Sequence, residues 1–179
     1  MKTRDQDHAD IGCLEVVEQL YSLLDGEVSD PQTLRTEILR LRDTALVCAT
    51  ERVYESLPIP RVTRVPGTKN FILGLANVRG NLITVIDLGC YLVGEPSQTT
   101  GSSRLLAATL RGRPVGLLVD EVFGQRNFMS NDASAPELAK HSPFAGLIRK
   151  QHRSGTDTWQ ELDLSVLFSQ PEFLDGSAA

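Results

Sequence analysis

This 179-residue chain has few of the residues that build cross-links or metal sites. It holds only three cysteines and three histidines, and none has Cys-x-x-Cys or His-x-x-His spacing, which argues against a structural zinc site. Cys13, Cys48 and Cys90 are odd in number and widely spaced, a pattern typical of small buried side chains in a reducing compartment. We therefore expect no disulfide framework, no metal and no cofactor.

The sequence also lacks a positive charge excess and a long apolar run. Its formal net charge is −5 and its pI is near 5.2, which argues against binding to nucleic acid or to an anionic membrane. The longest apolar runs end at charged residues or glycines well short of the roughly 20 residues that a membrane span needs. The first eight residues are charged and lack the apolar stretch of a secretory signal. These features predict a soluble, cytoplasmic protein.

Catalytic patterns are missing as well. His8, His141 and His152 lie in polar segments, and no nucleophile stands in a strand-turn-helix elbow. No Gly-x-x-x-x-Gly-Lys loop is present to hold a phosphate. Asp120 and Glu121 are adjacent carboxylates at the end of an apolar run, and adjacent strand residues point to opposite faces. The sequence therefore predicts a protein that is not an enzyme.

The most informative stretch that is present spans residues 70–88. Two short apolar runs flank Arg79-Gly80-Asn81, which predicts two buried strands joined by a tight turn, with Gly80-Asn81 at the positive φ angles. Arg79 would then lie at the tip of an apolar hairpin, where its fixed donors suit a carboxylate across an interface. The structural alternative is a salt bridge that holds two halves of the protein together, to Glu55 or Asp87.

Other segments also read as short strands. A strand, a turn near Arg42-Asp43 and a second strand are expected over residues 37–48. Further strands are expected at residues 104–110, 115–122, 144–148 and 158–162. Polar residues 130–143 predict a loop with one helical turn.

Two hairpin segments resemble each other within the chain. One ends in Ile86-Asp87-Leu88 and the other in Leu162-Asp163-Leu164. In both, the aspartate leaves a strand where a helical turn would begin, so it can cap the exposed amides there. This echo predicts a mainly β protein built from two related, small barrels.

An amphipathic helix is predicted at residues 11–24, where apolar side chains recur at three- and four-residue steps before Asp25-Gly26. Two roles remain open for it. It could pack on its own domain, or it could dock on a partner protein.

Four motifs in a fixed order resemble a known family. They are Pro60-Arg-Val-Thr-Arg-Val-Pro-Gly67, Gly74-Leu-Ala-Asn-Val-Arg-Gly80, Val85-Ile-Asp-Leu88, and Arg113-Pro-Val-Gly-Leu-Leu-Val-Asp-Glu-Val-Phe-Gly124. The chain is similar over residues 36–170 to the CheW-like domain of chemotaxis coupling proteins. The Val-Pro-Gly segment and the form of the turn favour the branch of that family that serves type IV pilus (twitching) signalling.

The resemblance implies a fold and a domain organisation. It implies two five-stranded, SH3-like β-barrels packed together, preceded here by a helix. We expect residues 1–33 to be a helical extension and linker, and residues 34–170 to be the CheW-like domain, with its two barrels divided near residue 94. Residues 171–179 would form a C-terminal tail.

The resemblance also implies a function and its surfaces. It implies an adaptor that couples the cytoplasmic tip of a methyl-accepting chemoreceptor to a CheA-type histidine kinase, recruited to receptor arrays. It further implies a kinase contact at Val53, Glu55, Gly74, Arg79 and Gly80, and receptor contacts at Val115, Leu117 and Val119. Two alternatives stay open: a CheW-like regulator of a different output, such as flagellar control, and a small β-barrel enzyme with a hidden site.

Overall fold

The computed structural model describes residues 33–138 and 142–176. The chain divides after Thr33 into two units, and the second, Leu34–Ala179, holds almost all of the described residues. The predicted helix at residues 11–24, with its two possible roles, lies outside the described residues, as do Cys13, His8 and His141.

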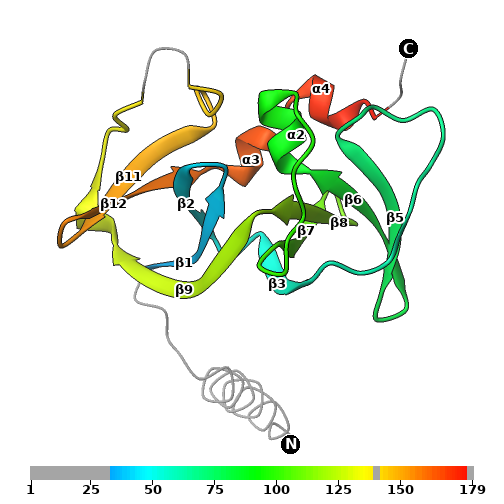
Figure 1. Ribbon diagram of the computed structural model, residues 1–179. Helices are drawn as coiled ribbons and strands as arrows, with labels where there is room; N and C mark the ends of the chain where they lie inside the picture. Colours follow the sequence, from blue (N-terminus) through cyan, green and yellow to red (C-terminus); the bar gives the residue numbers. More distant parts are fainter. Residues whose placement is uncertain (1–32, 139–141, 177–179) are drawn as a thin grey trace, which may run out of the picture. The chain divides into compact units, whose positions relative to one another are not determined.

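The described residues form a mainly β fold with two sheets and a few short helices (Figure 1). The strands are β1 (Thr33–Leu41), β2 (Thr44–Ala49), β3 (Val53–Pro58), β4 (Val62–Thr63), β5 (Ile72–Val78), β6 (Asn81–Asp87), β7 (Arg104–Leu110), β8 (Arg113–Val119), β9 (Glu121–Met129), β10 (Ala133–Ser134), β11 (Ile148–Ser154) and β12 (Asp157–Leu162). The helices are α2 (Leu88–Val93), the 3-10 helix η1 (Ser130–Asp132), α3 (Leu164–Leu167) and α4 (Pro171–Leu174).

The two sheets have one topology. The first sheet has the order β9-β1-β2-β12-β11-β10, and the second has the order β3-β7-β8-β6-β5-β4. If β9 to β12 are matched to β3 to β6, and β1 and β2 to β7 and β8, the two orders become identical. Each sheet contains five longer strands and one two-residue strand. This arrangement confirms the mainly β, two-part fold that the sequence predicted.

The internal echo extends to individual backbone bonds. The N–H of Asp87 donates to the carbonyl of Phe71, and the N–H of Asp163 donates to the carbonyl of Leu147. The two hairpins also share a register irregularity, after Ile72 in one and after Ile148 in the other. The two halves are therefore structural repeats in which the chain order is circularly permuted.

Both echoed aspartates act as the predicted helix caps. Asp87 accepts a hydrogen bond from the N–H of Cys90 at the start of α2, and Asp163 accepts from the N–H groups of Ser165 and Val166 at the start of α3. Asp87 also accepts from the N–H and hydroxyl of Ser97. This fixes the loop after α2 against the second sheet.

The expected division near residue 94 is wrong. The second sheet runs from β3 to β8, residues 53–119, and is inserted between β2 and β9 of the first sheet. The loop around Gly94 lies inside the second sheet's segment, because β6 and β8 pair in parallel, with Val85 opposite Gly116. The boundary between the two sheets is set by pairing between strands far apart in the chain, which the local sequence does not reveal.

A common core joins the two sheets. Leu39 and Leu46 of the first sheet and Leu106 and Leu117 of the second belong to the same buried cluster, with exposures of 1% or less. Helices α2, α3 and α4 lie between the sheets on one side (Figure 1). Burial of this much apolar surface is the main favourable term in folding.

The segment expected to be a C-terminal tail contributes to this core. Helix α4 buries Phe173 at 3% exposure. Its ring packs edge-on against Tyr91 of α2, with centroids 5.1 Å apart. The tail prediction is therefore wrong for residues 171–174, because a single aromatic residue after Pro171 carries too little periodicity to be recognised.

Two strand predictions near the C-terminus had different outcomes. Residues 158–162 lie in β12 as expected. Residues 144–147 form turns rather than a strand, and β11 begins only at Ile148. Gly146 has φ +82°, which interrupts an extended strand.

Candidate functional site

The tip of the β5–β6 hairpin is a two-residue turn. Its central residues are Arg79 and Gly80, with φ angles of +51° and +86°, and the closing pair is Val78 and Asn81. The N–H of Gly80 also donates to the side-chain oxygen of Asn77 over 2.8 Å. The predicted pair Gly80-Asn81 is thus displaced by one residue. The turn retains the two positive φ angles that a tight hairpin requires.

Arg79 occupies a backbone conformation that favours glycine. In the equivalent β11–β12 turn of the first sheet the corresponding residue is Gly155, with φ +64°. A non-glycine residue in the left-handed region costs roughly 1–2 kcal/mol. Of the residues that the structure describes, only Arg42, Arg79 and Arg111 share this non-glycine conformation. The turn geometry therefore does not explain an arginine at position 79.

The guanidinium of Arg79 forms an ion pair with Glu55 on β3, at 2.5 Å. The Arg79 side chain is 76% exposed and the Glu55 side chain 23% exposed. Both residues belong to the second sheet, so the pair does not hold the two halves together. Exposed ion pairs of this kind contribute little to stability, at most about 1 kcal/mol. The carboxylate instead positions a cation that faces solvent.

An exposed aromatic residue directly precedes Glu55 along the chain. Tyr54 precedes Glu55 on β3 and is 58% exposed. It was not predicted from the sequence, although the alternation Val53-Tyr54-Glu55-Ser56 at an edge strand is the pattern from which it could have been found. Because successive strand residues point to opposite faces, only Glu55, Arg79 and Gly80 are named the turn surface below.

Val53 and Gly74, which the resemblance also implies for the kinase contact, have roles inside the fold. Val53 is 6% exposed and packs in the core that joins the sheets. Gly74 has φ +137°, and a Cβ there would lie 2.1 Å from the carbonyl oxygen of Thr63. Both support the strands behind the turn surface without facing a partner.

The three residues implied for receptor contact are buried. Val115 is 4% exposed, and Leu117 and Val119 are 0% exposed, all in the common core. They cannot present an apolar face to a partner, so this expectation is wrong. The prediction correctly treated the β8 segment as strongly apolar, but the sequence alone did not reveal that this face is covered by the other sheet.

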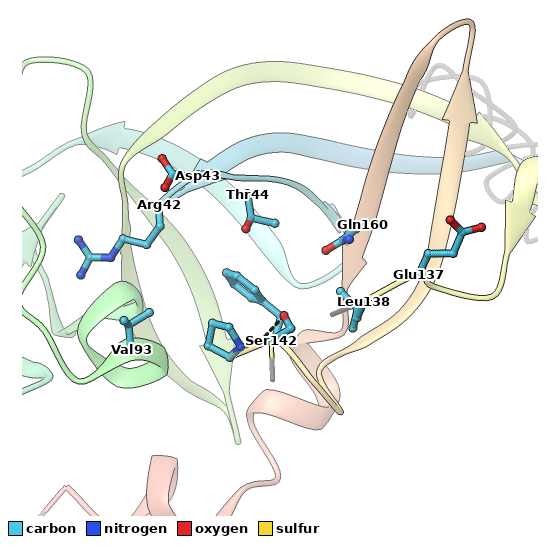
Figure 2. A pocket seen from close by; sticks show the side chains of 10 residues that line it. Arg42, Asp43, Thr44, Val93, Glu137, Leu138, Ser142 and Gln160 are labelled. Atoms are coloured by element: carbon cyan, nitrogen blue, oxygen red, sulfur yellow. Dashed lines mark hydrogen bonds between the residues drawn. The ribbon is translucent and has the colours of Figure 1, made fainter. Parts of the chain in front are cut away.

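A groove of about 540 Å³ opens instead where α2 approaches the first sheet (Figure 2). Its lining comes from separate parts of the chain: the β1–β2 turn with Thr44, the end of α2 with Val93, strand β12 with Gln160, and the loop residues Leu138 and Phe144. Val93 is 44% exposed. This junction groove has apolar side chains with polar ones between them, which suits a protein segment.

Several titratable residues of the described chain are engaged in structural contacts. The N–H of Arg42 donates to Asp120, and the guanidinium of Arg40 pairs with Glu121. Within residues 33–138 and 142–176, no group of three or more histidine, cysteine and acidic side chains is placed to hold a metal ion. Burial, together with a smaller effect of the nearby Glu37 carboxylate, raises the pKa of the Cys48 thiol to about 12. Cys48 is therefore protonated at neutral pH and a poor nucleophile.

His152 does not lie in a flexible polar segment, contrary to the sequence prediction. It is 1% exposed on β11, and its Nε2 lies 2.6 Å from a carboxylate oxygen of Glu161 on β12. Its ring packs against Phe128, with centroids 4.9 Å apart. The charged neighbours of His152 in sequence hid its burial, because exposed Arg149, Lys150 and Arg153 surround the buried pair Gln151 and His152 on β11.

Comparisons with known proteins agree with this geometry. The model of the CheW-like domain family matches residues 38–172. Protein PilI of Pseudomonas aeruginosa is 42% identical over 76 residues, which cover 42% of this chain and 43% of PilI. Protein FrzA of Myxococcus xanthus is 28% identical over 116 residues, which cover 65% of this chain and 72% of FrzA. The match to PilI therefore spans less than half of that protein.

The crystal structure of the scaffolding protein TtCheW from Thermoanaerobacter tengcongensis has a similar fold. It superposes with a TM-score of 0.66 at 22% identity, covering 77% of this chain and 94% of TtCheW. Among the described residues, no helix is long and apolar enough to cross a membrane. Since the family model matches well over half of the chain, this protein belongs to the CheW-like domain family.

Proposed function

We propose that this protein is a non-catalytic adaptor that couples a methyl-accepting chemoreceptor to a CheA-type histidine kinase, in chemosensory signalling to type IV pili. Membership of the CheW-like family supports the adaptor role, and the similarity to PilI supports the pilus pathway. The protein would work in the cytoplasm, at receptor arrays.

The observation that carries the proposal is the turn surface. Arg79 occupies a left-handed φ of the hairpin turn that glycine would adopt with less strain, and its guanidinium pairs with Glu55 while most of the side chain faces solvent. Backbone strain of this kind is retained where the side chain has a use. Arginine is also one of the residue types that most often dominate binding energy at interfaces. We assign the kinase contact to this surface.

The receptor contact is assigned to the junction groove. Val93 and Leu138 supply apolar side chains there, and Thr44 and Gln160 supply polar ones. A receptor segment that forms an amphipathic helix would bind by placing its apolar face in such a groove. This assignment replaces the buried residues of β8 and keeps the contact at the junction of the two halves.

The mechanism is scaffolding. Both surfaces are small, so each contact alone would be of modest affinity, and an array gains strength from many simultaneous contacts. The adaptor can transmit a signal only if it binds the active and inactive states of the kinase unequally. The two contacts lie on different parts of one core, so a receptor and a kinase can be bound together.

The test is reconstitution with purified components. The kinase domain that is itself CheW-like and a receptor cytoplasmic fragment are each titrated against the full chain, and then together by analytical ultracentrifugation. We expect two binary complexes and one ternary complex. Failure of both binary titrations, with proteins from the same genome, would contradict the adaptor role.

A second candidate is a CheW-like adaptor for another output. The probable chemotaxis protein CheW of Rhizobium etli is 37% identical over 60 residues, which cover 34% of this chain and 39% of that protein. Deletion of the chain's gene separates the candidates. Loss of twitching with normal swimming favours the pilus pathway, and the reverse result favours flagellar control.

A further inference from the structure

The segment that forms the second sheet has a net positive charge, although the whole chain is acidic. Residues 53–119 contain seven arginines and lysines but only three carboxylates, Glu55, Asp87 and Glu95, whereas the whole chain has a net charge of −5. Asp87 is buried at 1% exposure and caps α2, and Glu55 is paired with Arg79. No acidic residue occurs within residues 56–86 or 96–119. The surface of this sheet is therefore positive.

An exposed leucine lies on the second sheet near the tip of the β5–β6 hairpin. Leu82 on β6 is 63% exposed, the highest value among the large hydrophobic residues that the structure describes. It lines a groove of about 480 Å³ together with Arg61, Val65 and Leu75 on neighbouring segments. Single exposed leucines need no explanation, but this one adjoins an apolar floor.

Two arginines flank Leu82 across the sheet. In the parallel β6–β8 pair, Thr84 lies opposite Val115. Leu82 and Arg113 each stand two residues earlier on these strands. Because side chains two residues apart share a face of the sheet, Leu82 and Arg113 lie side by side on one face. On the other side, Asn77 is the register partner of Leu82, and Arg61 lines the groove beyond it. Neither Arg61 nor Arg113 forms an ion pair with any residue that the structure describes.

We propose that this surface, with Leu82 between Arg61 and Arg113, binds an acidic amphipathic segment of a partner protein. The segment would place one apolar side chain beside Leu82 and Leu75, and carboxylates against the two guanidinium groups. Arginine suits carboxylates because its planar fork can donate two parallel hydrogen bonds. The inference stands independently of the receptor and kinase assignments, since it uses neither the turn surface nor the junction groove.

The charge distribution favours an acidic peptide over other polyanions. A nucleic acid or an anionic membrane would present its negative charge to the whole chain, whose net charge of −5 repels it. A short segment meets only the local positive field and can fill the apolar groove.

The experiment is a selection with a random twelve-residue peptide library displayed on phage, using the full chain as bait. We expect the enriched peptides to carry a net negative charge around an apolar residue, and to bind more weakly as salt rises, because the contact is exposed. The test variant is Leu82→Thr with Arg113→Glu. Threonine keeps the strand preference of position 82, and we expect the dissociation constant to rise on the order of tenfold or more.

The matched control is Phe123→Thr with Lys150→Glu, which makes the same charge change on the first sheet at exposed positions. It should retain the peptides, and both variants should keep the melting temperature of the parent. Enriched peptides without an acidic excess, or peptides that bind the test variant as well as the control, would overturn the proposal.

Phosphatidylglycerol vesicles and a single-stranded oligonucleotide are titrated in parallel. If these bind and are lost in the test variant while no acidic peptide is enriched, the surface recognises a polyanion and the proposal is wrong.

Discussion

Arg79 shows how one residue can combine backbone strain with exposure. Its φ of +51° is of the kind that glycine adopts without strain, and the equivalent turn in the other half has Gly155. Its ion pair with Glu55 leaves 76% of the side chain in solvent. The strain and the exposure of Arg79 are the features on which the proposed kinase contact rests.

Replacement of Arg79 by glycine should separate stability from binding. Arg79→Gly relieves the positive φ and removes an exposed ion pair, so the melting temperature should be unchanged or slightly higher. Loss of a charge-assisted contact should weaken kinase binding by about 2 kcal/mol, or roughly thirtyfold in dissociation constant. Calorimetric titration against the kinase domain measures this effect. Arg111→Gly, at the equivalent position of the next hairpin, is the control and should bind normally. Equal affinities for the parent and Arg79→Gly would remove Arg79 from the interface.

Cys48 offers a second prediction at the residue scale. Its side chain is fully buried, and its pKa is raised to about 12, chiefly by burial. Since the reactive species is the thiolate, Cys48 should resist iodoacetamide in the native protein at about pH 8 and react once guanidinium chloride unfolds the chain. Peptide mass spectrometry reads the modification at Cys48 separately from the other cysteines. Rapid native modification would mean that the first sheet opens locally.

At the scale of elements, the glycine in β5 sets a close approach between strands. At Gly74 the chain passes so near β4 that a Cβ would meet the Thr63 carbonyl oxygen at 2.1 Å. Turn glycines differ, because Gly80 has a positive φ but open space around its α-carbon. A side chain at position 74 would therefore collide with the backbone, whereas a side chain at position 80 would only have an unfavourable φ angle.

Gly74→Ala should destabilise the fold more than Gly80→Ala. The first change adds a backbone collision to an unfavourable φ and should cost about 3 kcal/mol or more. The second adds only the cost of alanine in the left-handed region, roughly 1 kcal/mol. Urea denaturation of both variants gives their free energies of unfolding, which can be compared directly when the m-values are equal. Equal losses would indicate that β4 moves away from β5 at little cost.

Helix α2 links the second sheet to the junction groove. It begins at its Asp87 cap and ends at Val93, which lines the groove opposite the first sheet. Val93→Lys should abolish receptor binding, because a charged side chain replaces the apolar one, while lysine remains compatible with a helix C-terminus. Kinase binding should be unaffected. Parallel titrations of receptor fragment and kinase domain test this, and loss of both contacts would argue for a folding defect or a shared surface.

At the scale of the whole molecule, the two halves share one core. Phe173 of α4, near the end of the described chain, packs with Tyr91 of α2, which belongs to the second sheet's segment. The first sheet is assembled from both ends of the described chain, with the second sheet inserted between them. The largest buried cluster contains residues of both sheets, and each of the two smaller clusters lies within one sheet.

Unfolding should therefore be a single transition. Phe173→Ala removes a buried aromatic ring and should lower stability by about 3 kcal/mol or more. It should also leave one transition, with equal calorimetric and van't Hoff enthalpies. Hydrogen exchange should show the amides of β1 and of β6 losing protection together. Two resolved transitions would show that the halves fold independently.

The sequence by itself determined the local features of this protein. The hairpin at residues 70–88, the two aspartate caps and the echo between the halves were all visible, because each depends on residues close in the chain. The family motifs also led to the correct fold class, and they pointed to Arg79, which the structure places at an exposed tip.

Only the tertiary structure decided which apolar faces are covered. Val115, Leu117 and Val119 alternate in β8 as an exposed apolar strand face would, but the other sheet buries them. His152 has a polar sequence context, but a neighbouring strand and Phe128 enclose it. The sheet boundary near residue 119, rather than residue 94, follows from parallel pairing between strands far apart in sequence. The sequence pattern of a strand shows which residues share a face. Whether that face is buried depends on which distant segment of the chain packs against it, and only the complete fold determines that segment.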